Sequence, residues 1–156
     1  MTDQLRFDGR TAIVTGAGGN PSLGRAHALL LASRGANLVI NDIGRSAAPG
    51  YTGTASAEEV AEEVRAAGGK AVADTHSVAS EEGAAAIIQT ALDAFGGVDI
   101  LVNNAGFCVS APVDELTPAD FRSHVEVNLY GPFYLSRAAW PHMKAAGYGR
   151  IVNITS

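Results

Sequence analysis

Short apolar runs alternate with helical patterns along the whole chain. The runs are rich in β-branched residues and have the length of strands buried on both faces; they lie at 11–15, 37–41, 70–73, 98–102 and 150–154. Apolar positions three or four apart in the intervening segments predict helices over 22–34, 57–67, 80–95 and 117–146. This alternation predicts an α/β fold with a parallel sheet, right-handed crossovers and helices on both faces.

Two of the predicted helices have distinctive faces or ends. In the first helix Leu23, Ala26 and Leu30 fall on one face, which is the pattern of a helix packed against a core. The last helix begins at 117–120, where the order Thr-Pro-Ala-Asp is similar to a capping box with Pro at the first helical position. The apolar stripe of this last helix consists of Phe121, Val125 and Leu129.

The turn after the first run is a candidate phosphate site. Sheets of this kind bind ligands beyond the carboxyl ends of the strands, and a glycine-rich turn that leads into a helix offers free N–H groups to a pyrophosphate. The Gly-x-Gly-x-x-Gly pattern is incomplete, because Pro21 takes the place of the third glycine. The alternative is a glycine-rich turn in which Ser22 is an ordinary N-cap. The expected contacts are Gly16, Gly18, Asn20, Ser22, Leu23 and Gly24.

Asp42 ends the second apolar run, and Ile43 follows it. A carboxylate at this place can accept hydrogen bonds from the ribose hydroxyls of a dinucleotide, and it repels a 2′-phosphate. The sequence therefore favours NAD as the cofactor, with NADP less favoured but left open by the nearby Arg45. The alternative is an aspartate that only caps a strand.

Composition and charge exclude several other classes of protein. The chain has 156 residues, 47% of them hydrophobic, which is enough for one folded domain over 1–156. A net charge of −5 with only 11 Lys and Arg argues against a nucleic-acid partner. Cys108 is the single cysteine, and no apolar run approaches the roughly 20 residues of a membrane span. We therefore expect a cytoplasmic protein with no disulfide, no metal site and no membrane partner.

Four motifs in order carry a family resemblance: Thr15-Gly16, the Asn-Asn-Ala-Gly of 103–106, Asn128, and the Ile-Thr-Ser of 154–156. Together they resemble the short-chain dehydrogenase/reductase family, from about Phe7 to the last residue. Within the family the chain looks most like the 3-hydroxyacyl-CoA dehydrogenase and 3-oxoacyl reductase type. The resemblance implies a doubly wound Rossmann-type sheet of five strands in the order 3-2-1-4-5, truncated relative to the family because its C-terminal part is absent.

The resemblance also implies an activity and roles for residues. The family transfers a hydride between a nicotinamide and a small-molecule carbonyl or secondary alcohol. Ser156 would hydrogen-bond the substrate oxygen, and Asn128 would hold a water in a proton relay. Asn128 falls on the apolar stripe of its helix, where an amide needs partners, and a satisfied core Asn is the alternative. Further cofactor contacts would come from His76, Ser77, Asn104, Ala105 and Gly106.

The sequence departs from the family pattern in three places. Ser22 replaces a turn glycine, and the spacing from Gly16 to Ser22 resembles the enoyl reductases instead. The adenine-contacting Asp after the third strand is matched by His76, with Asp74 two residues earlier, so either could make that contact. The family's acid/base is a Tyr followed four residues later by Lys, and no such pair occurs in this sequence.

Several hypotheses therefore stay open. The favoured one is an NAD-dependent oxidoreductase of which these residues are the N-terminal portion, inactive as written and, by analogy, part of a homodimer or homotetramer. A nucleotide-binding module without turnover is the first alternative. An enoyl reductase-like member is the second, and it conflicts with the Asn-Asn-Ala-Gly motif at 103–106.

Overall fold

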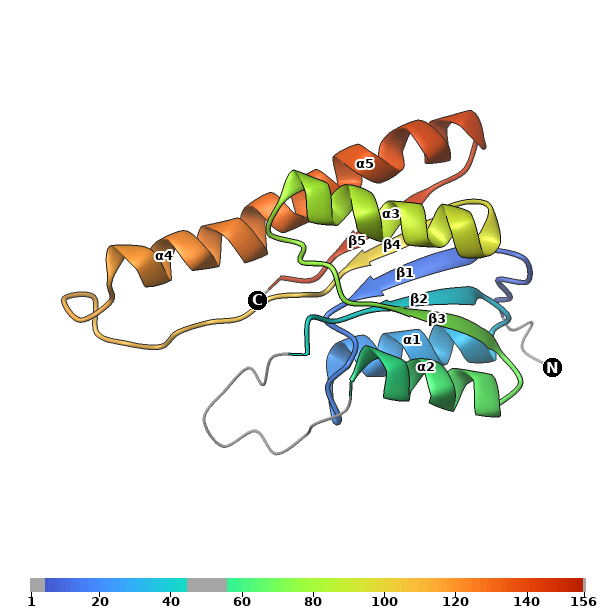
Figure 1. The fold of residues 1–156 in the computed structure, drawn as a ribbon, viewed down its shortest axis with the longest axis horizontal. Coiled ribbons are helices and arrows are strands. Elements are labelled where there is room, and N and C mark those ends of the chain that lie inside the picture. The colour runs from blue at the N-terminus through green and yellow to red at the C-terminus, as the bar shows by residue number, and fades with distance from the viewer. Residues whose placement is uncertain (1–4, 45–55, 156) are drawn as a thin grey trace.

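The computed structural model describes residues 5–44 and 56–155, which form one parallel sheet with helices on both faces (Figure 1). Ser156 and Arg45 lie outside the described residues. In chain order the elements are β1 (Thr11–Thr15), α1 (Leu23–Ser33), β2 (Asn37–Asn41), α2 (Ala57–Ala66), β3 (Lys70–Asp74), α3 (Glu81–Phe95), β4 (Ile100–Asn103), α4 (Pro118–Val125), the π-helical turn η1 (Glu126–Tyr130), α5 (Gly131–Ala145) and β5 (Arg150–Asn153).

The sheet has the strand order β3-β2-β1-β4-β5, and all four strand pairs are parallel. This order confirms the predicted doubly wound, Rossmann-type fold. The order reverses between β1 and β4, so the carboxyl ends of β1, β2 and β4 meet at one edge of the sheet. Thr15 pairs with Asn41 in the register, which brings the two ends of β1 and β2 level.

Helices cover each face of the sheet because the central strands are apolar on both sides. All five residues of β1 are buried, as the unbroken apolar run predicts. On one face α1 and α2 pack over Ala12, Leu38 and Ile40, with Val60 and Val64 of α2 fully inserted. On the opposite face α3 and α5 pack over Ile13, Val39 and Leu101. Figure 1 shows these two layers on either side of the sheet.

Side-chain caps set the starts of the helices. The hydroxyl of Ser22 accepts a hydrogen bond from Arg25 N, and that of Ser80 accepts one from Gly83 N. Thr117 and Asp120 form the predicted capping box, with Pro118 at the first helical position. The helix it starts runs on past Gly131 as predicted, but through a π-helical turn rather than as an uninterrupted α-helix.

The predicted core face of α1 is wrong. Leu23 and Leu30 are each 55% exposed and Ala26 is exposed, while Gly24 and Ala28 are buried. A Cβ at Gly24 would fall 2.5 Å from Nδ2 of Asn104 and closer still to the carbonyl oxygen of Gly16. The helix therefore approaches the sheet so closely that only small residues fit between them, and the larger side chains turn outward.

The predicted stripe on α4 is also not a core face. Among the described residues of α4 and η1 none is buried, and Phe121 and Leu129 are 60% and 62% exposed. Figure 1 shows the reason: α4 extends past the edge of the sheet, and of the long helix that α4 begins, only α5 lies over the sheet. Asn128 is exposed too, which contradicts its expected place among apolar neighbours.

Candidate functional site

The turn between β1 and α1 lies directly over the carboxyl end of the sheet. Gly16 has a φ of +63°, and a Cβ there would lie 2.8 Å from Cα of Ala105. Gly18 is equally confined, because its Cβ would lie 2.8 Å from Cβ of Asp42. The glycines therefore let the turn fit between the end of β2 on one side and the segment after β4 on the other.

Asp42 is joined to this turn by a hydrogen bond. Its Oδ2 accepts from the backbone N–H of Gly18 at 2.9 Å, and its Oδ1 accepts from that of Gly44 at 2.8 Å. A carboxylate oxygen has room for a further donor, so each oxygen can still accept a ribose hydroxyl. Ile43, which follows Asp42, is 48% exposed. The carboxylate is thus held against the turn.

The N-terminus of α1 follows directly after this turn. The hydroxyl of Ser22 accepts a hydrogen bond from Arg25 N at 3.1 Å, so Ser22 is the N-cap of α1, as the alternative to a phosphate contact predicted. Its own hydroxyl proton remains available to donate, so capping and ligand binding are compatible. Asn20 and Leu23 are exposed on either side of it. The free N–H groups and positive dipole end of α1 therefore meet the turn.

The segment after β4 is bound to β1 by the side chain of Asn104. Its Nδ2 donates to the carbonyl oxygens of Thr15 and Gly16, at 2.8 and 3.0 Å. In return Oγ1 of Thr15 accepts from the backbone N–H groups of Asn104 and Ala105, at 3.1 and 3.0 Å. The Asn104 side chain therefore has the structural role of holding the turn and this segment together.

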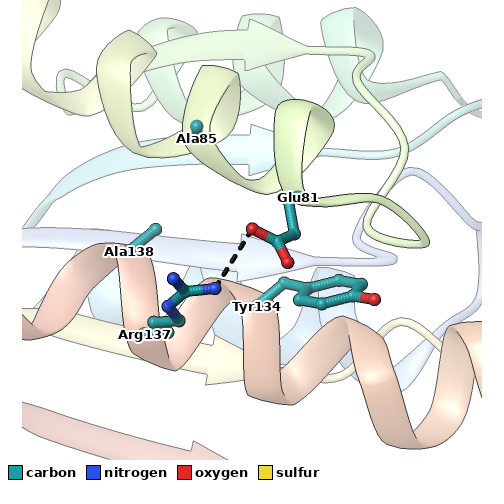
Figure 2. Close-up of a pocket in the computed structure, with 5 residues that line it drawn as sticks. All are labelled: Glu81, Ala85, Tyr134, Arg137 and Ala138. Atoms are coloured by element: carbon teal, nitrogen blue, oxygen red, sulfur yellow. Dashed lines mark hydrogen bonds and ion pairs between the residues drawn. The ribbon is translucent and has the colours of Figure 1, made fainter.

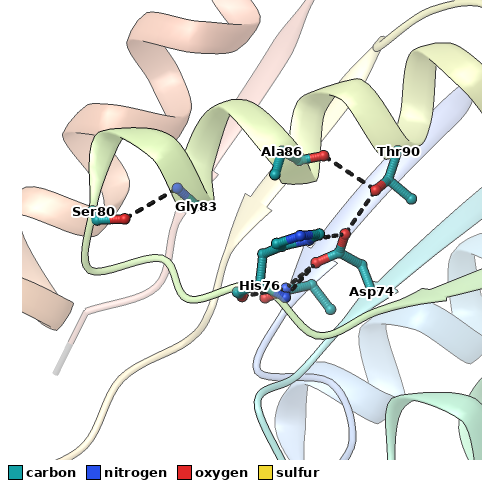
Figure 3. A network of polar contacts seen from close by, with 7 residues as sticks. Asp74, His76, Ser80, Gly83, Ala86 and Thr90 are labelled. Carbon is teal, nitrogen blue, oxygen red and sulfur yellow. Dashed lines mark hydrogen bonds and ion pairs between the residues drawn. The ribbon is translucent and has the colours of Figure 1, made fainter.

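Asp74 and His76 have different places at the end of β3 (Figure 3). The side chain of Asp74 is buried, whereas that of His76 is 56% exposed. Nδ1 of His76 lies 3.0 Å from Oδ2 of Asp74, and His76 N donates to Oδ1. Asn41 and Thr90 also donate to the carboxylate, each at 2.7 Å. His76, with the exposed Ser77, is thus the group that faces outward.

The pKa of Asp74 reflects these contacts. Burial alone would raise the pKa of this carboxyl, but the hydrogen bonds from His76, Thr90 and Asn41 together lower it below the usual value. Asp74 is therefore an ionised acceptor that organises the end of β3.

Asn128 binds the backbone of the loop that follows Gly106. Its Nδ2 donates to the carbonyl oxygen of Phe107 at 2.9 Å, and its Oδ1 accepts from Phe107 N at 3.2 Å. A Cβ at Gly106 would lie 2.8 Å from Oδ1 of Asn128. Asn128 is thus fixed beside the segment that ends β4, within a π-helical turn of the kind that often marks functional sites.

Ser156 is one of the predicted catalytic residues, and it lies outside the described residues. The chain leading to it is placed by Ile154, whose N–H donates to the carbonyl oxygen of Asn103 at 2.9 Å. Asn103 Nδ2 in turn donates to Oδ1 of Asn153 at 2.8 Å. The end of β5 therefore runs beside the Asn-Asn-Ala-Gly segment.

Three polar residues that sequence reasoning did not assign to the site prove to organise it: Thr15, Asn41 and Thr90. Asn41 joins β2 to β3, since Nδ2 reaches both Asp74 and the carbonyl oxygen of His76. The sequence could have indicated Thr15 and Asn41, because each is a polar residue at the last position of a buried strand and needs a hydrogen-bond partner. Thr90 lies mid-helix and offers no such signal.

A shallow pocket of about 200 Å³ lies elsewhere, between α3 and α5 (Figure 2). Glu81 and Arg137 form an exposed ion pair across it at 3.1 Å, with Tyr134 beside them. None of the predicted site residues lines it. We therefore assign the site to the strand ends and not to this pocket.

The strand-end site suits a dinucleotide on the observations above. The N–H groups of Ala17 and Gly18 are donated within the protein, so the N-terminus of α1 is what this region offers to a diphosphate, and the adjoining carboxylate of Asp42 is an acceptor for hydroxyls. In the part of the chain that the structure describes, no three His, Cys, Asp or Glu side chains gather as metal ligands would.

The chain matches the model of the short chain dehydrogenase family over residues 10–156. Because this match covers nearly all of the sequence, the chain belongs to the short-chain dehydrogenase/reductase family, a family of oxidoreductases. The resemblance carried by the motifs at 15–16, 103–106, 128 and 154–156 is thereby confirmed.

Individual relatives agree with the family. The mouse (Mus musculus) peroxisomal multifunctional enzyme type 2 is 44% identical over the whole chain. A solved 7α-hydroxysteroid dehydrogenase, complexed with NADH and 7-oxo glycochenodeoxycholic acid, is 37% identical with a TM-score of 0.86 over 100% of this chain. A gluconate 5-dehydrogenase from Burkholderia cenocepacia, in complex with NADP and tartrate, is 36% identical with a TM-score of 0.81 over 99% of it.

The chain spans only part of each relative. It covers 20% of the mouse protein and 56% of each of the two solved dehydrogenases. Among the described residues, no helix has the length and apolar character needed to cross a bilayer.

Proposed function

We propose that this chain forms the cofactor-binding face of an oxidoreductase that transfers a hydride between NAD(H) and a carbonyl or secondary alcohol. The observation that carries the proposal is the 2.9 Å hydrogen bond from Gly18 N to Asp42, which unites the phosphate-binding turn with the ribose-binding carboxylate. Membership of the dehydrogenase family supports the reaction class.

Each predicted residue has a part in holding the cofactor. The turn from Gly16 to Gly24, with Asn20, Ser22 and Leu23, holds the diphosphate, and Asp42 with Ile43 holds the adenosine ribose. His76 and Ser77 lie against adenine, with His76 rather than the buried Asp74 in contact. The segment 104–106 lines the second ribose. When bound, the nicotinamide supplies or accepts the hydride, and the protein orients it.

The substrate side lies at the ends of β4 and β5. Ser156 would donate a hydrogen bond to the substrate oxygen, and Asn128 would hold a water for proton transfer. No Tyr of the sequence precedes a Lys by four residues, so we propose that these 156 residues bind cofactor without turning substrate over.

The substrate class is a 3-hydroxyacyl or 3-oxoacyl compound. The support is the closer sequence likeness to that branch of the family. The similar 7α-hydroxysteroid dehydrogenase is named for the same functional group, an alcohol on a larger carbon skeleton.

A second copy of the chain is the proposed partner of the α4–α5 surface. Phe121, Leu129, Phe133 and Trp140 are each more than half exposed along it, and several large exposed apolar side chains on one long helix favour an interaction site. The expected cytoplasmic location is a proposal only, because some relatives are enzymes named as peroxisomal.

The preference for NAD tests the proposed role of Asp42. Calorimetric titration of the wild type should give tighter binding of NAD than of NADP. Asp42→Asn removes the charge that opposes a 2′-phosphate, so the ratio of the two affinities should fall about tenfold, since a unit charge a few ångströms away contributes about 1 to 2 kcal/mol.

Asp93→Asn is the matched control, because it removes one exposed carboxylate from α3 and leaves the strand ends intact. Its affinity ratio should equal that of the wild type. Equal binding of NAD and NADP by the wild type, or an unchanged ratio in Asp42→Asn, would remove the proposed role of Asp42.

A further inference from the structure

Two arginines lie against one tyrosine ring where the strands of the sheet begin. The guanidinium carbon of Arg10, the residue before β1, is 3.7 Å from the centroid of the Tyr148 ring. The guanidinium carbon of Arg150, the first residue of β5, is 4.7 Å from the same centroid. Because all five strands are parallel, this cluster lies at the end of the sheet opposite the candidate dinucleotide site (Figure 1).

A single carboxylate accompanies these two cations. Oδ1 of Asp99 accepts a hydrogen bond from Nη1 of Arg10 at 2.7 Å, and its Oδ2 accepts one from Thr11 N at 2.8 Å. Among the described residues, no carboxylate forms an ion pair with Arg150, whose Nη1 donates to the carbonyl oxygen of Gly149 at 2.7 Å. One of the two adjacent positive charges is therefore not matched by a negative charge.

The guanidiniums are held in place and remain accessible. The face of an aromatic ring attracts a cation, and a guanidinium that lies over a ring keeps the N–H groups along its edge free to donate. The side chain of Arg10 is 41% exposed, and Arg150 is exposed. A carboxylate arriving from solvent would therefore meet donors that are already ordered, and charge-assisted hydrogen bonds to arginine are among the strong ones.

The rest of this end of the sheet is basic as well. Among the described residues that lead into the strands or begin them, the basic ones are Arg6, Arg10, Arg34, Lys70 and Arg150. The two acidic ones are Asp8, which pairs with Arg6, and Asp99, which pairs with Arg10. The whole chain carries a net charge of −5, so this end has the opposite sign to the molecule. An acidic ligand would be attracted here and repelled elsewhere.

We propose that this end of the sheet, centred on Arg10, Tyr148 and Arg150, binds an acidic segment of a protein partner. An aspartate or glutamate carboxylate of the segment lies between the two guanidiniums, and further carboxylates face Arg34 and Lys70. Neighbouring strands are about 4.8 Å apart, so the starts of β3 and β5 are separated by about 19 Å, which about six residues of extended chain span. The bound segment is therefore short, extended and rich in acidic residues.

Titration of the full-length protein with a hexaglutamate peptide at low salt tests this proposal. Backbone amide chemical shifts should change most at Thr11, Tyr148 and Arg150, and added salt should weaken the binding because the charges lie at the surface. Free glutamate and inorganic phosphate should each bind at least about tenfold more weakly than the peptide, because each occupies only the position between the arginines.

Variants of the cluster show which groups bind the peptide. Arg150→Gln should weaken hexaglutamate binding about three- to tenfold, as expected for one charged contact of this kind. Arg122→Gln is the matched control, since it removes one exposed positive charge from α4, and its affinity should equal that of the wild type.

A second pair of variants examines the ring. Tyr148→Leu keeps both charges but removes the ring that orders them, so it should also weaken binding. Tyr148→Phe keeps the ring and should bind as the wild type does. An unchanged amide spectrum without peptide shows that each variant is folded.

The proposal is overturned if millimolar hexaglutamate leaves the amides of Tyr148 and Arg150 unchanged, or if Arg150→Gln and Arg122→Gln lose affinity equally. Phosphate that binds as tightly as the peptide would overturn it too, because the cluster would then be a site for a small anion. These results do not depend on NAD, since the dinucleotide is proposed to bind at the opposite end of the sheet.

Discussion

At the residue scale, Asp74 shows how a buried charge supports the site without facing it. Its carboxylate accepts hydrogen bonds from Asn41, Thr90 and the backbone and ring of His76. Those donors join the ends of β2 and β3 and reach α3. A buried acceptor with this many donors is costly to remove, because each donor is then left unpaired.

We predict that Asp74→Asn lowers the free energy of unfolding at pH 7 by about 1 to 3 kcal/mol, because the amide cannot accept from all of these donors. Since folding lowers the pKa of Asp74, its stabilising contribution is present above the ordinary carboxyl pKa and is lost as the pH falls through the lowered value. The difference between variant and wild type should therefore shrink from pH 7 to pH 3.

Urea unfolding at the two pH values measures this difference. Asp93→Asn, on the exposed side of α3, is the control and should change the stability little at either pH. A difference for Asp74→Asn that stays constant down to pH 3 would contradict the assigned role.

Single residues also show where sequence reasoning succeeds. The contact of Gly18 with Asp42 follows from two adjacent parallel strands that end level, which the apolar runs and glycine-rich turn already indicate. Which of Asp74 and His76 is buried and which is exposed could not be predicted from the sequence, since it depends on how the chain turns after β3. Spacing along a chain does not determine the direction of a side chain in such a turn.

At the element scale, α4 is a helix supported mainly by its own start. Among its described residues none is buried, so packing contributes little to its stability. Thr117 Oγ1 accepts from Asp120 N at 3.1 Å, and the Asp120 carboxylate accepts from Thr117 N at 3.2 Å. The capping box therefore has a larger share in the stability of α4 than a cap has in a buried helix.

We predict that Thr117→Ala frays α4 locally. Loss of the cap costs about 1 kcal/mol, which corresponds to about fivefold faster amide exchange over 120–125. Exchange in β1 and β4 should not change, and Thr117→Ser, which keeps the hydroxyl, should behave as the wild type. Unchanged exchange over 120–125 in Thr117→Ala would show that other contacts hold the helix.

The elements themselves were largely predictable, and their faces only partly. Unbroken apolar runs marked the strands, and apolar positions three or four apart marked the helices. The larger side chains of α1 predicted the wrong buried face. This helix approaches the sheet so closely at Gly24 and Ala28 that only small residues fit there. The stripe with Phe121 and Leu129 was wrongly expected among apolar neighbours for a different reason. An apolar stripe predicts a helix but does not determine what, if anything, covers it.

At the scale of the whole molecule, the apolar surface of α4 and α5 is exposed and does not pack against the sheet. Trp140 on this surface is 61% exposed and is the single tryptophan of the chain. Its fluorescence therefore reports directly on whether a second copy covers the surface.

We predict that the protein sediments as a dimer or tetramer. On dilution the copies should separate and expose Trp140 to water, so its emission should shift to longer wavelength. Phe133→Glu should shift the equilibrium toward monomer, because it buries a charge in the interface. Leu30→Glu adds the same charge at an exposed apolar position of α1 and should leave the assembly intact. A wild type that stays monomeric at high concentration would contradict the proposed partner.

The central claim is that a dinucleotide lies across the ends of β1, β2 and β4. The most direct measurement is the change in backbone amide chemical shifts on titration with NAD. The account predicts the largest changes at the turn and its neighbours, namely Gly18, Gly24, Gly44 and Ala105. Chemical-shift changes confined to the pocket between α3 and α5, around Glu81 and Arg137, or no changes at saturating NAD, would contradict the central claim.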